Sequence, residues 1–86
     1  MKKINYKNVS FYDNGGITLD RITVIFNDSK RITKDGCIYD CLACSYTGNG
    51  FFLHCNAMKG KHLGKKVSFD NLSTELQKRL NTYFND

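Results

Sequence analysis

The sequence predicts an α+β fold, in which an antiparallel sheet of four to five strands is covered by one C-terminal amphipathic helix. Apolar and polar residues alternate over much of the chain, glycine and asparagine turns separate these stretches, and leucines recur near the C-terminus at helical spacing. A sheet with a helix on its apolar face belongs to the α+β class. At 86 residues, the chain is expected to form a single domain, residues 1–86.

The first two strands are predicted to form a hairpin around Asn14-Gly15-Gly16. Both glycines accept the positive φ that tight hairpin turns require. One strand is expected from about Ile4 to Tyr12 and the next from about Thr18 to Phe26. The second strand shows a period of two, which predicts one well-buried face. Ile22, Val24 and Phe26 are assigned to that face, and they alternate with Arg21, Thr23 and Ile25 on the other.

Polar turns divide the middle of the chain into further strands. The segments Asn27–Lys30 and Lys34–Gly36 carry turn-forming residues and are expected to bound a loop. Another break falls at Thr47–Gly50, where two of four residues are glycine. The strands predicted here cover about Cys37 to Ser45, Phe51 to Cys55 and Lys66 to Phe69.

The last part of the chain predicts a helix that packs on the sheet. Side chains from Asp70 to Ser73 offer N-capping oxygens. The opposite face of the helix is charged and polar, as expected of a solvated surface. The apolar stripe consists of Leu72, Leu76, Leu80, Tyr83 and Phe84.

Composition indicates a moderately basic protein without a membrane segment. Thirteen basic and eight acidic residues give a net charge of +5, which favours encounters with polyanions. No apolar run approaches the roughly 18 residues that a membrane-spanning helix needs. The N-terminus lacks the apolar stretch of a signal peptide. We therefore expect a cytoplasmic protein that has no membrane partner.

The four cysteines raise the question of zinc. A Cys-x2-Cys step such as Cys41 to Cys44 can place two thiolates on one ion, and His54, Cys55 or His62 could complete the tetrahedron. The surroundings instead predict strand, without the glycine-rich knuckle usual around such a pair. Buried free thiols are therefore expected, and no metal or other cofactor is predicted.

The segment from Lys59 to Lys66 is the strongest candidate for a binding site. Two glycines let the backbone approach a ligand, and the lysines supply positive charge. A nucleotide-hydrolysing phosphate loop is excluded, because one residue is missing between the glycines and Lys66 replaces the magnesium-binding hydroxyl. A looser anion-binding loop and a tight turn with solvated lysines are the alternatives. The candidate ligand-binding residues here are Lys59, Lys61, His62, Lys65 and Lys66.

A second group of candidates surrounds the first turn. Tyr12, Asp13 and Arg21 could form the wall of a polar pocket, with Arg21 holding a carboxylate or phosphate bidentately. The alternative is an exposed Arg21 that pairs with Asp13 or Asp20. No arrangement of nucleophile, base and orienting carboxylate is supported by the spacing, so we do not expect an enzyme.

These motifs together resemble a family of small proteins carried by bacteriophages, prophages and plasmids. The resemblance spans about residues 9 to 80 and does not include the cysteines. It implies no activity, but it implies a context in which small proteins bind host components stoichiometrically and blunt host immunity. The matching elements are Tyr12-Asp13-Asn14-Gly15-Gly16, Asp20–Val24, Gly50-Phe51 with His54, Gly60–Val67 and Leu72.

The leading hypothesis is a non-enzymatic antagonist of host antiviral defence, acting in the host cytoplasm on an anionic target. One version captures a nucleotide signal or another phosphorylated small molecule, and would need a pocket at the interface of a homo-oligomer. The other version blocks a nucleic-acid-dependent defence nuclease, as an anti-CRISPR protein does. Alternatives are a zinc-stabilised protein-interaction module and a nucleic-acid-binding accessory protein. The aromatics available for base stacking are Tyr12, Tyr46, Phe51 and Phe52.

Overall fold

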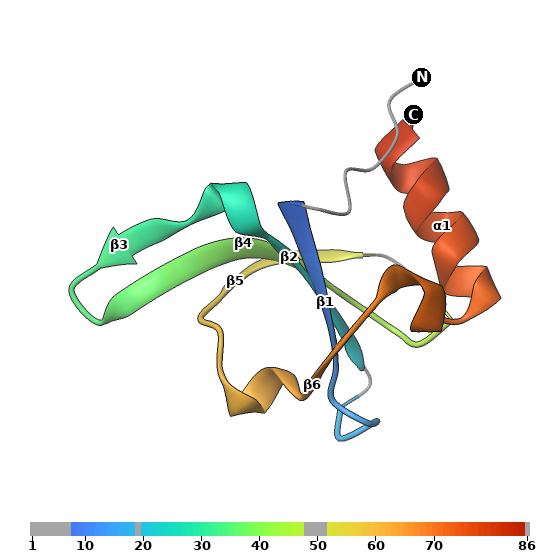
Figure 1. Ribbon diagram of the computed structural model, residues 1–86, viewed down its shortest axis with the longest axis horizontal. Helices are drawn as coiled ribbons and strands as arrows, with labels where there is room; N and C mark the ends of the chain where they lie inside the picture. Colours follow the sequence, from blue (N-terminus) through green and yellow to red (C-terminus); the bar gives the residue numbers. More distant parts are fainter. Residues whose placement is uncertain (1–7, 19, 48–51, 86) are drawn as a thin grey trace.

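A computed structural model describes residues 8–18, 20–47 and 52–85 of the chain and confirms the α+β class. Its elements form a curved antiparallel sheet with one α-helix on one side (Figure 1). The strands are β1 (Val9–Asp13), β2 (Ile22–Phe26), β3 (Arg31–Thr33), β4 (Gly36–Cys44), β5 (Leu53–Ala57) and β6 (Lys65–Val67). The helix is α1 (Thr74–Asn85), and the short 3-10 turns are η2 (Asn27–Ser29), η3 (Lys61–Leu63) and η4 (Phe69–Asn71).

The strands follow one another as a meander that finally returns to its start. Antiparallel pairs join β1 to β2, β2 to β4, and β4 to β5. After η3 the chain comes back, and β6 pairs with the free edge of β1. Segments that are far apart in the sequence, residues 11–13 and 65–67, therefore lie side by side.

The short strand β3, which pairs with the first residues of β4, was not predicted. Residues 27–29 form the expected turn, but Arg31–Thr33 then extend along β4 and give the described sheet six strands. The Thr33 hydroxyl closes the β3–β4 turn by donating to the carbonyl of Gly36 at 2.9 Å. All three β3 residues are exposed, so burial imposes no alternation on them and the sequence carries no strand signal.

Several predicted strand ends shift by a few residues. Strand β2 begins at Ile22 rather than near Thr18, so the connection after β1 is longer than predicted. Strand β5 continues to Ala57, and β6 ends at Val67 because η4 follows. The predicted start of the first strand, residues 4–7, and Phe51 lie outside the described residues.

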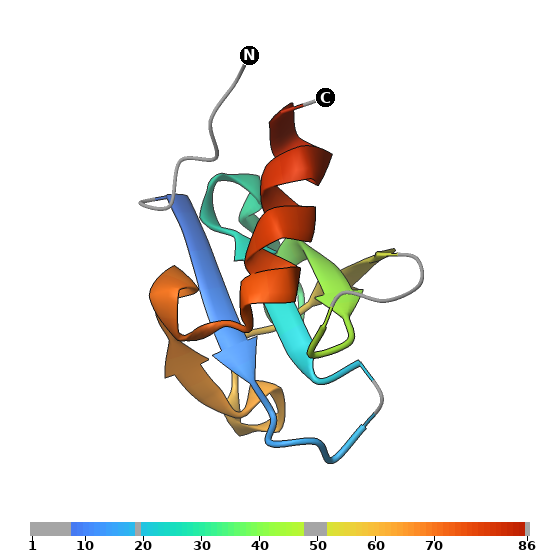
Figure 2. The same ribbon diagram turned by 90° about the vertical axis from the view of Figure 1, so that its right-hand side faces the viewer.

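One side of the sheet forms the main core with α1. Figure 2 shows the helix lying across this side. Leu76 and Leu80 are fully buried, as the spacing of leucines predicted. Burial of a leucine side chain contributes about 1.5 to 3 kcal/mol, so the helix is a principal source of stability. The buried residues of this cluster are Phe11, Ile22, Val24, Leu42, Cys44, Leu72, Leu76 and Leu80.

Ser73 fixes where α1 begins and ties that end to the sheet. Its hydroxyl oxygen accepts a hydrogen bond from the backbone N–H of Leu76 at 3.1 Å, which is the N-cap contact. The same hydroxyl donates to the carbonyl of Tyr46, just after β4, at 2.7 Å. With 12 residues, α1 is too short to span a bilayer, and no other described helix is long or apolar enough to do so.

The opposite side of the sheet carries a second, smaller core that was not predicted. Ile25, Cys41 and Leu63 are its buried members. Ile25 was assigned to the less buried face of its strand, yet it is fully buried because Leu63 covers it. The residue that closes this core thus comes from the segment that was singled out for its lysines.

Candidate functional site

The fold brings the two groups of candidate binding residues to the same end of the molecule. In the pairing of β1 with β6, Tyr12 lies opposite Lys66 and Asp13 lies opposite Lys65. Gly64, with φ of +88°, packs against the backbone of Asp13 and Asn14. The polar turn after β1 and the lysine loop (residues 59–66) therefore share one surface, although some 45 residues separate them in the sequence.

The lysine loop is held in place by one apolar side chain. Leu63 is 6% exposed and anchors η3 in the second core. Its neighbours Lys61 and His62 are exposed, as are Lys65 and Lys66 in β6. Leu63 and the β1–β6 pairing hold this part of the backbone, so η3 and β6, which carry these side chains, lie next to each other (Figure 1). Lys65 and Lys66 are consecutive residues of β6, and their side chains therefore point to opposite faces of the sheet.

Lys59 differs from the other lysines because it contacts the protein itself. Its ammonium group donates to Asn27 Oδ1 at 2.8 Å and lies 4.6 Å from the centroid of the Tyr39 ring. Asn27 in turn bonds the buried Ser10 hydroxyl at 3.0 Å. Lys59 is therefore partly a structural residue that fastens the loop to the β2–β3 connection.

Arg21 forms an ion pair with Asp13, which was one of the two alternatives considered for it. Its Nε donates to Asp13 Oδ1 at 2.6 Å and a terminal nitrogen donates to Oδ2 at 3.0 Å. These hydrogen bonds lower the pKa of Asp13 below 3.8. The guanidinium also lies 4.3 Å from the centroid of the Tyr46 ring. The two guanidinium nitrogens that could bind an external carboxylate or phosphate bidentately thus bind Asp13 instead.

The turn after β1 is ordered by its own side chains. Asp13 Oδ1 accepts the backbone N–H of Gly15, and Asn14 Oδ1 accepts those of Gly16 and Ile17. Such contacts are the reason that aspartate and asparagine favour turns. Tyr12 is half-buried and packs against the second core. Asp13, Asn14 and Tyr12 therefore have structural roles beside the lysine loop.

The residues considered as conditional zinc ligands lie on both sides of the sheet. Cys41 belongs to the second core, whereas Cys44 belongs to the main core beneath α1. Cys55 lies opposite Cys41, and His54 Nε2 forms a 2.6 Å hydrogen bond with the Tyr83 hydroxyl of α1. Among the described residues, no three His, Cys, Asp or Glu side chains are grouped closely enough to hold a metal ion.

Burial also makes two of these cysteines poor metal ligands. It is the main factor that raises the pKa of Cys44 to about 12, and it does the same for Cys41 with help from the adjacent Cys55 thiol. Metal ligation requires the thiolate, which a pKa this high disfavours at neutral pH. The geometry favours the interpretation of Cys41 and Cys44 as buried free thiols.

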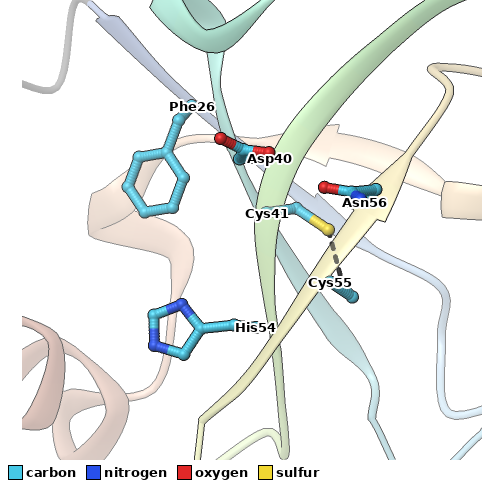
Figure 3. Close-up of a pocket in the computed structure, with 6 residues that line it drawn as sticks. All are labelled: Phe26, Asp40, Cys41, His54, Cys55 and Asn56. Atoms are coloured by element: carbon cyan, nitrogen blue, oxygen red, sulfur yellow. Dashed lines mark hydrogen bonds between the residues drawn. The ribbon is translucent and has the colours of Figure 1, made fainter.

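Sequence reasoning missed a hollow of about 420 Å³ at the junction of β4 and β5 (Figure 3). Asp40 and Asn56 are opposite each other in the strand pairing, and Arg31 donates to both, at 3.0 and 3.4 Å. These residues are far apart in the sequence, so only the strand register shows that they meet. The hollow is lined by Phe26, Asp40, Cys41, His54, Cys55 and Asn56.

A smaller hollow, of about 310 Å³, lies where β6 turns away from β1. Lys66 and Ser68 border it from one side, and Ser10 and Asn27 from the other. Lys66 is the one member of the lysine loop that lines either of these two hollows. The exposed side chains of Lys61, His62 and Lys65 border neither of these two hollows.

The structure is thus a small α+β domain in which the lysine loop lies beside the ordered turn after β1. Comparison of the chain with protein-family models, with curated proteins and with solved structures found no match. Inferences about function therefore depend on the chemistry of this surface and on the resemblance of its motifs.

Proposed function

We propose that the protein acts by stoichiometric binding of an anionic macromolecular partner through the lysine loop. The observation that carries this proposal is the exposure of Lys61, His62, Lys65 and Lys66 on two adjoining segments, η3 and β6. Within the described residues, the salt bridges join Arg21 to Asp13 and Arg31 to Asp40, so neither neutralises these lysines. Positive charge of this kind, fixed on a rigid backbone, suits a partner that carries phosphates or carboxylates.

The exposed lysines are not gathered in either hollow described above, and we therefore favour an extended partner over a small phosphorylated ligand. Capture of a small molecule requires a concave site that surrounds most of it. Lys61, His62 and Lys65 line neither of the two hollows described above. A polyanion or an acidic protein face, by contrast, needs no such concave site.

The aromatic side chains considered for base stacking do not support a stacking platform on this surface. Tyr12 is half-buried, and Tyr46 lies beneath Arg21. Phe52 packs edge-on against Tyr83 of α1, with ring centroids 5.2 Å apart, and Phe51 lies outside the described residues. A nucleic acid would therefore be contacted through its phosphates, without base-specific stacking.

The resemblance to proteins of phages and plasmids points to antagonism of host antiviral defence as the biological role. In this proposal, the lysine loop covers an anionic surface of a nucleic-acid-dependent defence complex and blocks access to it, in the manner of an anti-CRISPR protein. Arg21 and Asp13 hold the neighbouring turn in place and do not themselves contact the target.

The proposal is tested with two triple variants that remove the same charge. Lys61, Lys65 and Lys66 are changed to alanine in one, and the exposed Lys30, Lys34 and Lys78 in the control. The affinity of both variants is measured for labelled single-stranded DNA, duplex DNA and polyglutamate. Both are also expressed in bacteria that carry an antiviral defence system, and these bacteria are then challenged with phage. We expect binding and protection of the phage to be lost only in the first variant. Equal activity of the first variant and the wild type would remove the lysine loop from the function.

A further inference from the structure

Two of the four cysteines face each other across adjacent strands. Cys41 of β4 and Cys55 of β5 are directly opposite in the antiparallel pairing, and their sulfur atoms are 2.8 Å apart (Figure 3). Directly opposite residues of antiparallel strands have Cα atoms about 4.5 to 5.5 Å apart. That separation is within the range of about 4.4 to 6.8 Å that disulfides span.

The other cysteines cannot replace either member of this pair in the folded protein. Cys37 precedes Cys41 by four residues of the same strand, which places it about 13 Å away at roughly 3.3 Å per residue. Cys44 faces the main core, on the other side of the sheet, and its thiol contacts the carbonyl oxygen of Ile22 at 3.7 Å. Of the four cysteines, only Cys41 and Cys55 have sulfur atoms close enough, and on the same face of the sheet, to form a disulfide.

We propose that Cys41 and Cys55 are an oxidative modification site, at which a peroxide or a low-molecular-weight disulfide such as oxidised glutathione forms an intramolecular disulfide. This proposal does not depend on the function proposed for the lysine loop. It assigns a chemical role to a thiol pair that the proposed binding surface does not use.

The chemistry balances with either oxidant. With oxidised glutathione, the thiolate of Cys55 attacks one sulfur of the glutathione disulfide and releases one reduced glutathione. The Cys41 sulfur, as it loses its proton, then attacks Cys55 and releases the second. With hydrogen peroxide, Cys55 becomes a sulfenic acid with loss of water, and condensation with Cys41 releases another water.

The order of attack follows from the surroundings of the two thiols. Cys55 is partly exposed, whereas Cys41 is buried. Burial, assisted by the Cys55 thiol, raises the pKa of Cys41 to about 12, so Cys41 is the poorer first nucleophile. Cys55 therefore reacts first with the oxidant, and Cys41 resolves the intermediate.

The disulfide would link β4 to β5 covalently at the core that supports the lysine loop. Cys41 and Leu63 are both buried members of the second core, and Cys55 packs against it. The bond would also close the segment between β4 and β5 and restrict the unfolded chain. Oxidation is therefore expected to stabilise the second core, in which Leu63 anchors the lysine loop.

The test uses the full chain, first fully reduced and then incubated under native conditions with oxidised glutathione or hydrogen peroxide. The protein is unfolded, alkylated with N-ethylmaleimide and digested for mass spectrometry. We expect two alkylated cysteines instead of four, and a crosslinked peptide that joins Cys41 to Cys55. The melting temperature should rise by about 10 °C or more and return to its starting value with dithiothreitol.

Two variants complete the test. Cys37→Ser should oxidise like the wild type, whereas Cys55→Ser should show no intramolecular disulfide and no oxidant-dependent rise in melting temperature. The wild-type mapping decides the question even if one variant folds poorly. The proposal is overturned if Cys41 and Cys55 both stay alkylatable, if the disulfide maps elsewhere, if Cys55 stops at a mixed disulfide, or if oxidation leaves the melting temperature unchanged or lower.

Discussion

Gly64 packs directly against the backbone of Asp13, and no side chain could stand in its place. A Cβ atom built on Gly64 would overlap the carbonyl oxygen of Asp13 and lie 2.5 Å from Asn14 Cα. The φ of Gly64, +88°, is also one that side chains with a Cβ rarely adopt. This contact joins the ordered turn after β1 to the lysine loop, so the two motifs form one structural unit.

Gly64→Ala should therefore destabilise the protein by about 2 to 5 kcal/mol, because backbone strain and a steric clash add together. Gly15→Ala is the matched control: its φ is +78° but a Cβ there would meet nothing within 4 Å. Strain alone predicts a cost of roughly 1 to 2 kcal/mol for this control. Urea unfolding measures both, and equal losses would contradict the close contact of Gly64 with Asp13.

The ion pair between Asp13 and Arg21 should make stability depend on pH in acid. Hydrogen bonding from Arg21 lowers the pKa of Asp13 below its usual 3.8. The stabilisation is thus fully present above that value and is lost as the pH falls through the lower folded pKa. Melting temperatures recorded between pH 6 and about pH 2 should fall more steeply for the wild type than for Asp13→Asn. Asp35→Asn, in the exposed β3–β4 turn, is the control and should keep the wild-type slope.

Packing of α1 on the sheet is tested by Leu76→Ala and Leu80→Ala. Both leucines are fully buried, so each change should leave a cavity and cost about 2 to 4 kcal/mol in the free energy of unfolding. Thr82→Ala, on the exposed face of the same helix, serves as the control. Losses below about 0.5 kcal/mol at both leucines, typical of exposed sites, would show that the helix does not pack here.

Salt dependence should show how many lysines contact a nucleic acid, if that is the partner. Each phosphate contact on duplex DNA contributes about 0.9 to the slope of log affinity against log salt concentration. Alanine at Lys61, Lys65 and Lys66 should flatten this slope by up to about 2.7 and leave the melting temperature nearly unchanged, because exposed lysines contribute little to stability. A slope that stays the same would mean that these lysines do not face the phosphates.

Metal analysis of the purified protein should find less than one zinc per chain. Cys41 and Cys44 face opposite sides of the sheet, so the Cys-x2-Cys step cannot supply two ligands to one ion without rearrangement. The measurement is made by inductively coupled plasma mass spectrometry on reduced protein. Stoichiometric zinc whose removal by a chelator unfolds the protein would contradict the placement of these cysteines.

Local patterns in the sequence were enough to predict the helix and the turn after the first strand. Leu76 and Leu80 lie on the buried face of α1, and Ser73 caps the helix through a neighbour three residues away. Leu72, which was predicted as part of the same stripe, joins this core from just before the helix begins. Asp13 and Asn14 likewise order their turn through residues two or three positions on. All of these interactions join residues a few positions apart, and such residues are close in space because the chain is continuous.

The second core, the Cys41–Cys55 contact and the packing of Gly64 on Asp13 were decided only by the tertiary structure. Ile25 looked like a residue of the less buried face until Leu63, nearly 40 positions later, was seen to cover it. The same holds for Asp40 and Asn56, which meet through the register of β4 and β5. Sequence determined which segments could form strands and a helix. Which strands pair, and in which register, depends on the joint burial of residues from distant segments, and no local pattern encodes that.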